Sequence, residues 1–112
     1  MNQSNTTTDP IAFARALADN TRQEIMTMCC CEWRSVGELA DSLDVTQPTV
    51  SHHLAFLRDA DLVIARPEGR QTFYLLNQDQ VAKCCGVLMV DYAPDLAPSE
   101  EALDLGSSED PA

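Results

Sequence analysis

The chain has 112 residues, 45% of them hydrophobic, and its 18 acidic and 7 basic side chains give a formal net charge of −11. This length suits one compact domain, no stretch approaches the ~20 apolar residues that span a bilayer, and the polar start does not resemble a signal peptide. We therefore expect a cytoplasmic protein without a membrane partner, with a disordered N-terminus at residues 1–9, a domain at 10–92 and an acidic disordered tail at 93–112.

The acidic side chains concentrate at the end of the chain. Residues 91–112 hold seven acids and no bases, which leaves 11 acids against 7 bases, or −4, in residues 1–90. Local charge at a docking face matters more for contact with phosphates than the total charge does. Because no basic stripe is present, we expect modest non-specific affinity for DNA and a shallow dependence on salt, if DNA is the partner.

Two helices are expected in the first third of the chain. The proline after residue 9 suits a first helical turn, and apolar residues follow it at helical spacing. These residues are Ile11, Ala14, Leu17 and Ala18. A second helix is expected near residue 20, where Thr21 and Glu24 have the spacing of a capping box. Its apolar face ends at Cys29, a predicted core residue, whereas Cys30 and Cys31 follow at the helix end and point elsewhere.

The middle of the chain predicts two short helices joined by a tight turn. Ser35 and Glu38 form a second capping box, and Asp44-Val45 makes the turn before Thr46, which caps the next helix. The predicted inward positions of that helix are Val50, Leu54 and Leu57. At 100° per residue, small and hydrogen-bonding groups occupy the opposite face. The outward residues are Pro48, Thr49, Ser51, His52 and Ala55, with Gln47 and His53 on the flanks.

A β-hairpin is expected after these helices. Residues 62–66 and 71–75 are rich in β-branched and aromatic side chains, and residues 67–69 have the composition of a turn. Arg66 and Arg70 flank the tip. Such a hairpin, placed directly after two helices joined by a turn, is typical of a wing that contacts the DNA backbone or minor groove.

A last helix is expected from residue 77. Asn77 and Gln80 have the spacing of helix-capping residues, and Pro94 and Pro98 end the helix. The apolar face is predicted to contain Val81, Cys85 and Leu88. The predicted fold is therefore mainly α with a β-hairpin wing, a winged helix-turn-helix.

Three segments carry a family resemblance: ALADNTRQEI, SVGELADSLDVTQPTVSHHLAFLRDADLV and RPEGRQTFYLL. Over residues 16–88 the chain resembles the arsenical- and metal-responsive repressors of the ArsR/SmtB family. The resemblance implies a homodimer, paired through the first and last helices, that binds double-stranded operator DNA until an inducer binds at cysteine or histidine sites. The DNA-binding residues that it implies are Gln47, Thr49, Ser51, His52 and His53 in the recognition helix and Arg66, Gly69 and Arg70 in the wing.

Two departures from the family pattern narrow the inducer site. Arsenite-sensing members carry Cys-Val-Cys at the start of the third helix, where this chain has Ser35-Val36-Gly37. Zinc-sensing members use Asp, His and Glu along the last helix, and the last helix here has no histidine. The remaining candidates are two cysteine clusters, Cys29–Cys31 and Cys84–Cys85.

Soft thiolates select soft metal and metalloid ions, and trivalent arsenic takes three of them. We therefore expect As(III) or another soft metal ion as the inducer, without an organic cofactor. The predicted metal ligands are Cys30, Cys31 and one or both of Cys84 and Cys85. Relatives that sense persulfide imply an alternative, a dithiol switch between Cys29–Cys31 and Cys84–Cys85. Either event would change the angle between subunits and spoil the spacing of the two recognition helices on DNA.

Other classes of function are less compatible with the sequence. A catalytic cysteine needs a histidine base nearby, and both histidines, His52 and His53, belong to the predicted DNA-binding helix. No glycine-rich phosphate loop is present, so we do not expect an enzyme. A winged helix that binds other proteins remains an alternative, because the acidic charge would suit it.

Overall fold

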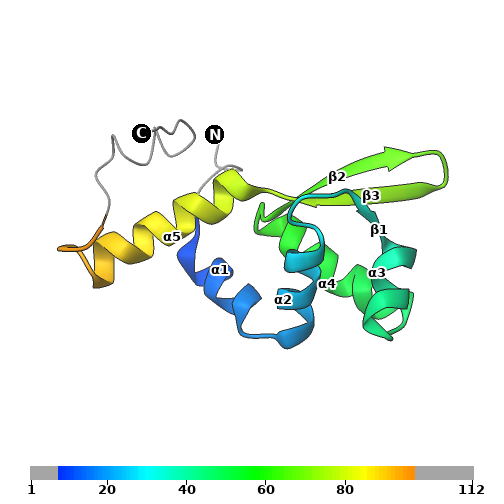
Figure 1. Cartoon of the computed structure of the whole chain (residues 1–112), viewed down its shortest axis with the longest axis horizontal. Coiled ribbons are helices and arrows are strands. Elements are labelled where there is room, and N and C mark those ends of the chain that lie inside the picture. The colour runs from blue at the N-terminus through cyan, green and yellow to red at the C-terminus, as the bar shows by residue number, and fades with distance from the viewer. Residues whose placement is uncertain (1–7, 98–112) are drawn as a thin grey trace.

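The computed structural model of the chain describes residues 8–97, so most of the predicted N-terminal segment and most of the predicted tail lie outside the described residues. Its elements in chain order are α1 Pro10–Leu17, α2 Asn20–Met28, β1 Arg34–Ser35, α3 Val36–Leu43, α4 Gln47–Asp59, β2 Val63–Glu68, β3 Gln71–Leu76 and α5 Gln78–Tyr92 (Figure 1). The predicted winged helix-turn-helix is confirmed. Within residues 8–97, no helix is both long and apolar enough to cross a membrane.

The elements form a helical body with two projections. Helices α2, α3 and α4 pack together, and the β2–β3 wing and helix α5 extend from them in opposite directions (Figure 1). Helix α1 lies against α5. This arrangement places the helix-turn-helix and the wing toward one end of the protomer and α5 toward the other.

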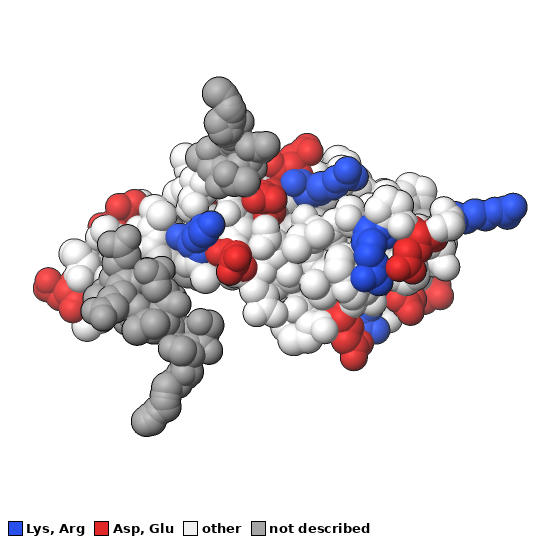
Figure 2. Space-filling model, turned by 90° about the horizontal axis from the view of Figure 1, so that it is seen from above, with Lys and Arg blue, Asp and Glu red and all other residues white. Residues whose placement is uncertain are grey.

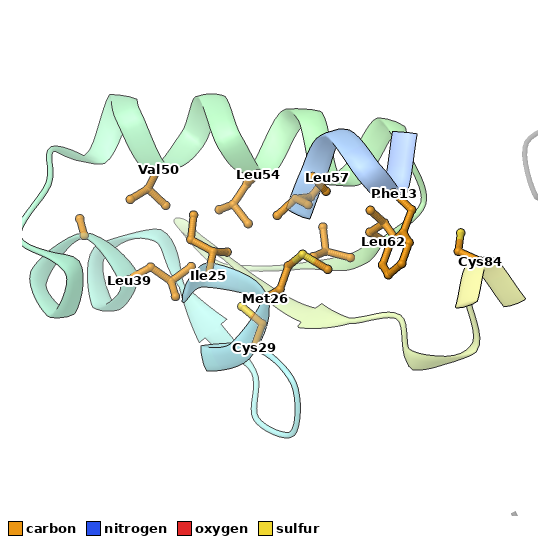
Figure 3. Close-up of a cluster of buried hydrophobic side chains, with 13 residues drawn as sticks. Phe13, Ile25, Met26, Cys29, Leu39, Val50, Leu54, Leu57, Leu62 and Cys84 are labelled. Atoms are coloured by element: carbon orange, nitrogen blue, oxygen red, sulfur yellow. The ribbon is translucent and has the colours of Figure 1, made fainter. Parts of the chain in front are cut away.

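The core is formed mainly by large aliphatic side chains from the helices (Figure 3). Ile25, Leu39, Leu54 and Leu57 are at most 1% exposed, as is Cys29, so the prediction that this cysteine is a core residue is confirmed. Removing such apolar surface from water is the main stabilising term of a domain of this size.

Helix α1 buries a different face from the predicted one. Its buried residues are Phe13 and Ala16, whereas Ile11 is 66% and Leu17 is 38% exposed. Asp9 was expected to be disordered, but its carboxylate accepts hydrogen bonds from the amides of Ile11 and Ala12 and caps the helix. The predicted stripe is therefore an apolar surface that the protomer leaves uncovered.

The predicted caps are confirmed where they depend on local sequence. Ser35 and Glu38 form both hydrogen bonds of the capping box at α3, and the Thr46 hydroxyl accepts from the Thr49 amide at the start of α4. The capping box at Thr21 is wrong, because helix α2 begins at Asn20, so Thr21 lies inside the helix, and the Asp19 carboxylate accepts the capping hydrogen bond.

Two predictions for α5 are wrong. Asn77 occupies the N-cap position but makes no side-chain cap; its amide nitrogen instead donates to the carbonyl of Asp61, which ties α5 to the end of α4. The inward cysteine is Cys84, 1% exposed, whereas Cys85 is exposed. The Cys84 thiol faces the carbonyl of Asp9 at 3.8 Å, on the side of α5 that packs against α1.

The sheet has three antiparallel strands in the order β1-β3-β2. Strand β1 was not predicted; it pairs Arg34 with Tyr74. The wing strands extend further than predicted, because residues 67 and 68 continue β2 and leave a loop of Gly69 and Arg70. Gly69 takes a φ of 61°, which glycine adopts without steric cost at the first position of a tight hairpin loop.

The end of α4 offers a test of backbone strain. Asp61 has a φ of 63°, and the amides of Asp61 and Leu62 donate to the carbonyls of Arg58 and Leu57, as in a glycine-terminated helix. We expect Asp61→Gly to raise the free energy of unfolding by about 0.5–1 kcal/mol, measured by urea denaturation. The matched control Asp59→Gly replaces the last residue of α4, which is helical and gains nothing from glycine, so it should not raise the free energy of unfolding. A loss of stability in both variants would contradict this account.

Candidate DNA interface and thiol site

The outward face of α4 carries short polar side chains. Gln47, Thr49, Ser51 and His52 are all exposed, on the side of the helix opposite the buried Val50, Leu54 and Leu57. The Thr46 and Thr49 hydroxyls lie 2.9 Å apart and fix each other at the start of the helix. Such a surface fits a major groove, where hydroxyl, amide and imidazole groups hydrogen-bond to base edges and phosphates.

His53 does not share this exposed face. Its side chain is 13% exposed, Nδ1 lies 3.2 Å from Nη1 of Arg22, and Nε2 lies 4.0 Å from the Asp19 carboxylate. Because the guanidinium can only donate, Nδ1 is the acceptor and the ring is neutral with its proton on Nε2. Burial lowers the pKa of His53 below its ordinary value. This environment favours a structural role for His53 instead of the DNA contact that the motif implied.

Arg22 holds this junction together. Its guanidinium lies 4.4 Å from the centre of the Phe56 ring and donates to the carbonyl of Arg15. The arginine therefore joins α1, α2 and the recognition helix α4. Sequence reasoning missed it, because only the tertiary fold brings residue 22 to residues 53 and 56.

The two wing arginines lie in different surroundings. The guanidinium of Arg66 lies 4.2 Å from the centre of the Trp33 ring, and its Nε lies 3.1 Å from the Glu68 carboxylate. Arg70 is exposed in the two-residue loop. Arg66 therefore braces the wing against the segment that precedes β1, whereas Arg70 is available to a phosphate. The contact with Trp33 was also missed, because Trp33 carries no local signal beyond that of a packing residue.

Acidic and basic side chains are interspersed on the face of the molecule that Figure 2 draws. Figure 2 shows blue and red groups side by side on the face drawn, with a basic side chain projecting at the end that carries the wing. The predicted lack of a basic stripe agrees with this view.

The predicted inducer site begins in the turn after α2, Cys29–Cys31, which we call the thiol turn. The sulfur atoms of Cys30 and Cys31 lie 2.8 Å apart, and Cys30 is partly and Cys31 fully exposed. The turn is held from both sides: the Leu76 amide donates to the Cys29 carbonyl, and the Gln78 side chain donates to the Cys30 carbonyl. The thiol turn is thus bound to the end of β3 and the start of α5.

The five thiols differ in reactivity. Burial raises the pKa of Cys29 to about 11, and burial also raises the pKa of Cys84. The hydrogen bond with Cys31, together with burial, raises the pKa of Cys30. Cys29 and Cys84 are also buried, so an ion reaches their sulfur atoms only after a local rearrangement, which makes them poor ligands. The accessible thiols are Cys30, Cys31 and Cys85.

The protomer does not bring the two cysteine clusters into one site. Among residues 8–97, no group of three or more His, Cys, Asp or Glu side chains is arranged to hold a metal ion. Cys84 instead packs against the start of α1. The pair Cys30 and Cys31 is therefore the part of the predicted ligand set that one protomer assembles by itself.

A second surface lies at the other end of the molecule. Helices α1 and α5 form a groove of about 510 Å³ whose apolar walls include Ile11, Leu88 and Tyr92. Tyr92 is 81% and Val90 is 58% exposed. An apolar face of this kind is typical of a protein–protein interface.

The comparisons with known sequences agree with one another. The model of the family described as bacterial regulatory protein, arsR family, matches residues 19–65. The HTH-type transcriptional regulator CmtR of Mycobacterium tuberculosis is 38% identical over 105 residues, which are 86% of this chain and 89% of that protein. The arsenical resistance operon repressor of Bacillus subtilis is 38% identical over 60% of this chain and 65% of its own length. The biofilm growth-associated repressor of Agrobacterium fabrum is 46% identical over 59% of this chain, which spans only 54% of that protein.

Solved structures give the same fold. Reduced HlyU from Vibrio cholerae is 33% identical, with a TM-score of 0.60 over 74% of this chain and 87% of that one. A possible ArsR-family regulator of Mycobacterium bovis, solved as a homodimeric winged helix-turn-helix domain, is 27% identical, with a TM-score of 0.60 over 72% of this chain and 76% of its own. An ArsR-like regulator from Rhodococcus sp. RHA1 is 25% identical, with a TM-score of 0.69 over 91% and 94%.

The placement of His53 predicts a dependence of stability on pH. Because the folded pKa lies below the unfolded value of about 6.5, the unfolded chain binds the proton more readily. The free energy of unfolding should therefore fall as the pH drops below about 6.5, until the folded pKa is passed. Urea denaturation at several pH values should show a shallower slope in His53→Gln, whereas His52→Gln, exposed on the same helix, should keep the wild-type slope. Equal slopes in His53→Gln and wild type would refute the assignment.

Proposed function

The chain belongs to the ArsR family of bacterial regulatory proteins, and from this premise we propose that it is a homodimeric repressor that thiol chemistry releases from operator DNA. It would act by binding and not by catalysis. Two of the relatives above are named repressors, which supports repression as the proposed direction of regulation.

The proposed DNA interface consists of the outward face of α4 and the tip of the wing. Gln47, Thr49, Ser51 and His52 supply hydrogen-bonding groups for base edges, and Arg70 supplies charge for a phosphate. Gly69 allows the tight loop that projects this arginine. Arg66 serves mainly as the brace of the wing.

The proposed dimer forms through α1 and α5. The exposed Ile11 and Tyr92, with the apolar groove between the two helices, are the supporting observations. Two recognition helices bind successive major grooves only when they stand one helical turn of DNA apart, about 34–36 Å. A small change in the direction of α5 would therefore lower affinity for the operator.

The observation that carries the proposal is the double attachment of the thiol turn. Its carbonyls bind the end of the wing strand β3 and the first turn of α5, and Trp33, two residues after Cys31, stacks on Arg66 of the wing. An ion held by Cys30 and Cys31 would change the shape of this turn. That change would reach the wing and the dimer helix together.

The proposed inducer is As(III) or another soft metal ion. Cys30 and Cys31 are the two ligands that every predicted ligand set contains, and we call them the constant pair. Cys85, the exposed member of the second cluster, is the candidate third thiolate, whereas burial disfavours Cys84.

A second candidate function rests on the same short contact. Cys30 and Cys31 are accessible thiols in contact, so they can be oxidised together, with a persulfide or peroxide as the oxidant that takes two electrons and two protons. A disulfide between them requires the turn to distort, because neighbouring Cα atoms across a trans peptide lie about 3.8 Å apart. The switch between Cys29–Cys31 and Cys84–Cys85 that the resemblance implied receives less support, because Cys29 and Cys84 are buried.

The role of the wing tip is testable by salt dependence. Arg70→Ala should weaken operator binding and reduce the slope of log K against log salt by about 1, since one phosphate contact is lost. Lys83→Ala removes the same charge from α5 and should leave the slope unchanged. Fluorescence anisotropy with labelled operator DNA measures both, and equal slopes in Arg70→Ala and wild type would exclude the contact.

The role of the thiol turn is testable by release from DNA. The double variant Cys30→Ser, Cys31→Ser should bind the operator as wild type does, but arsenite should no longer release it, so the midpoint of release should rise at least about tenfold. Cys85→Ser should shift the midpoint less, because the constant pair remains. Release of the double variant at the wild-type arsenite concentration would remove the proposed site.

A further inference from the structure

Three helices meet at the guanidinium of Arg22, on α2. Its Nη2 donates to the carbonyl of Arg15 in the last turn of α1, at 2.8 Å, and its Nη1 lies 3.2 Å from Nδ1 of His53 on α4. The same group lies over the ring of Phe56, one turn further along α4. One planar cation therefore joins the proposed dimer helix α1 directly to the recognition helix α4.

This junction fixes a direction on which operator binding depends. The two recognition helices of a dimer reach successive major grooves only when α4 keeps a constant angle to the helices that form the dimer. The aliphatic core that holds α4 contributes a non-directional force. The hydrogen bonds of a guanidinium and its stacking on a ring are directional, so they select one angle.

We propose that Arg22 and His53 are a positioning pair for operator binding, which holds the angle between α1 and α4 only while the His53 imidazole is neutral. This inference rests on the proposed function, because the angle matters only to a protein that binds operator DNA as a dimer. Both residues act through the direction of α4, and neither touches the DNA itself.

The chemistry of the contact requires the neutral ring. A guanidinium has no acceptor, so Nδ1 of His53 must accept from it. A proton on Nδ1 would place two donors and two positive charges 3.2 Å apart. Among the described residues, Nε of Arg22 is a buried atom without a hydrogen-bond partner, so the cation is enclosed and water screens the repulsion poorly. Protonation of His53 would therefore separate Arg22 from α4.

The other charged groups around the imidazole do not remove this conflict. Asp19, at the N-cap of α2, lies 4.0 Å from Nε2 and favours the proton, whereas Arg22 and His52 oppose it. The His52 ring lies 5.8 Å away on the same helix. Helix α3 and strand β2 also pack on α4, but the described charged groups that act on His53 come from neither. Burial has the largest effect and lowers the pKa of His53, so the junction opens only in acidic solution.

Arg22→Lys tests the positioning role. Lysine keeps the positive charge but cannot donate in two fixed directions from a plane stacked on a ring. The probes are a duplex that the wild-type protein selects from random sequences and an unrelated duplex of equal length. We expect the variant to bind the selected duplex at least about tenfold more weakly and the unrelated duplex less than about twofold more weakly, since phosphate contacts do not require one angle. Glu24→Asp, exposed on the same helix outside the junction, should change neither.

The pH profile is the measurement that a purely structural role would leave unchanged. His53→Asn places an uncharged acceptor near the position of Nδ1 and does not titrate. Between pH 7.5 and 5.0, the affinity of wild type for the selected duplex should fall at least about threefold relative to that of His53→Asn, within the limit of about tenfold per pH unit for one proton. Both proteins retain His52, so its titration cancels. Circular dichroism at each pH checks that both are folded.

A second measurement uses wild type alone. The chain has two histidines, so nuclear magnetic resonance can follow the titration of each imidazole. Because binding requires the neutral His53, the selected duplex should lower the pKa of this residue. An equal loss for both duplexes or no loss in Arg22→Lys, parallel pH profiles of wild type and His53→Asn, or a His53 pKa that the duplex does not lower would overturn the proposal. The proposed function fails separately, when the wild-type protein selects no duplex.

Discussion

The attachment of the thiol turn to its two neighbours is the constraint on which the rest of the structure depends. The Cys29 carbonyl accepts from Leu76 at the end of the wing, and the Cys30 carbonyl accepts from Gln78 at the start of α5. Both bonds are accepted by backbone carbonyls and neither uses a sulfur atom, so the thiols themselves remain available to a ligand. A change in the positions of the two sulfur atoms must therefore displace β3, displace α5 or distort the turn itself. One small segment is thus attached to both β3 and α5, the elements that the proposed function assigns to DNA contact and to dimer formation.

A second set of contacts, centred on Arg22, holds α1, α2 and α4 together. Arg22 joins α1 and α2 to Phe56 and His53 of α4, and the Asp19 carboxylate, whose pKa the Arg22 amide lowers, faces the same imidazole. Because this junction holds the recognition helix to α2, a movement of the thiol turn is expected to displace the wing and α5 relative to α4. A coupling free energy of about 2–3 kcal/mol between inducer binding and DNA binding is sufficient for a large change in operator occupancy.

The sequence predicts the features that depend on neighbours in the chain and misses those that depend on distant contacts. The caps at Ser35 and Thr46 are formed by residues three positions apart, and both are confirmed. Strand β1 has only two residues and exists because β3 lies beside it. The rotation of α5, which buries Cys84 instead of Cys85, accompanies its packing on α1, where Cys84 faces Asp9, 75 residues earlier. The role of Trp33 depends likewise on Arg66. The predicted combination of Cys30 and Cys31 with Cys84 or Cys85 is not assembled within residues 8–97 of one protomer.

The charge of the protein fits this mode of control. A DNA-binding domain with a strong basic stripe holds DNA through many phosphate contacts, and an inducer must overcome all of them. Here the guanidinium of Arg66 contacts the Trp33 ring and the Glu68 carboxylate. Acidic groups lie beside basic ones on the face that Figure 2 shows. The proposed interface then depends on a few short side chains of α4 and on the position of the wing tip. Such an interface is sensitive to geometry more than to charge, which agrees with the proposed control by a thiol site that changes the shape of the turn.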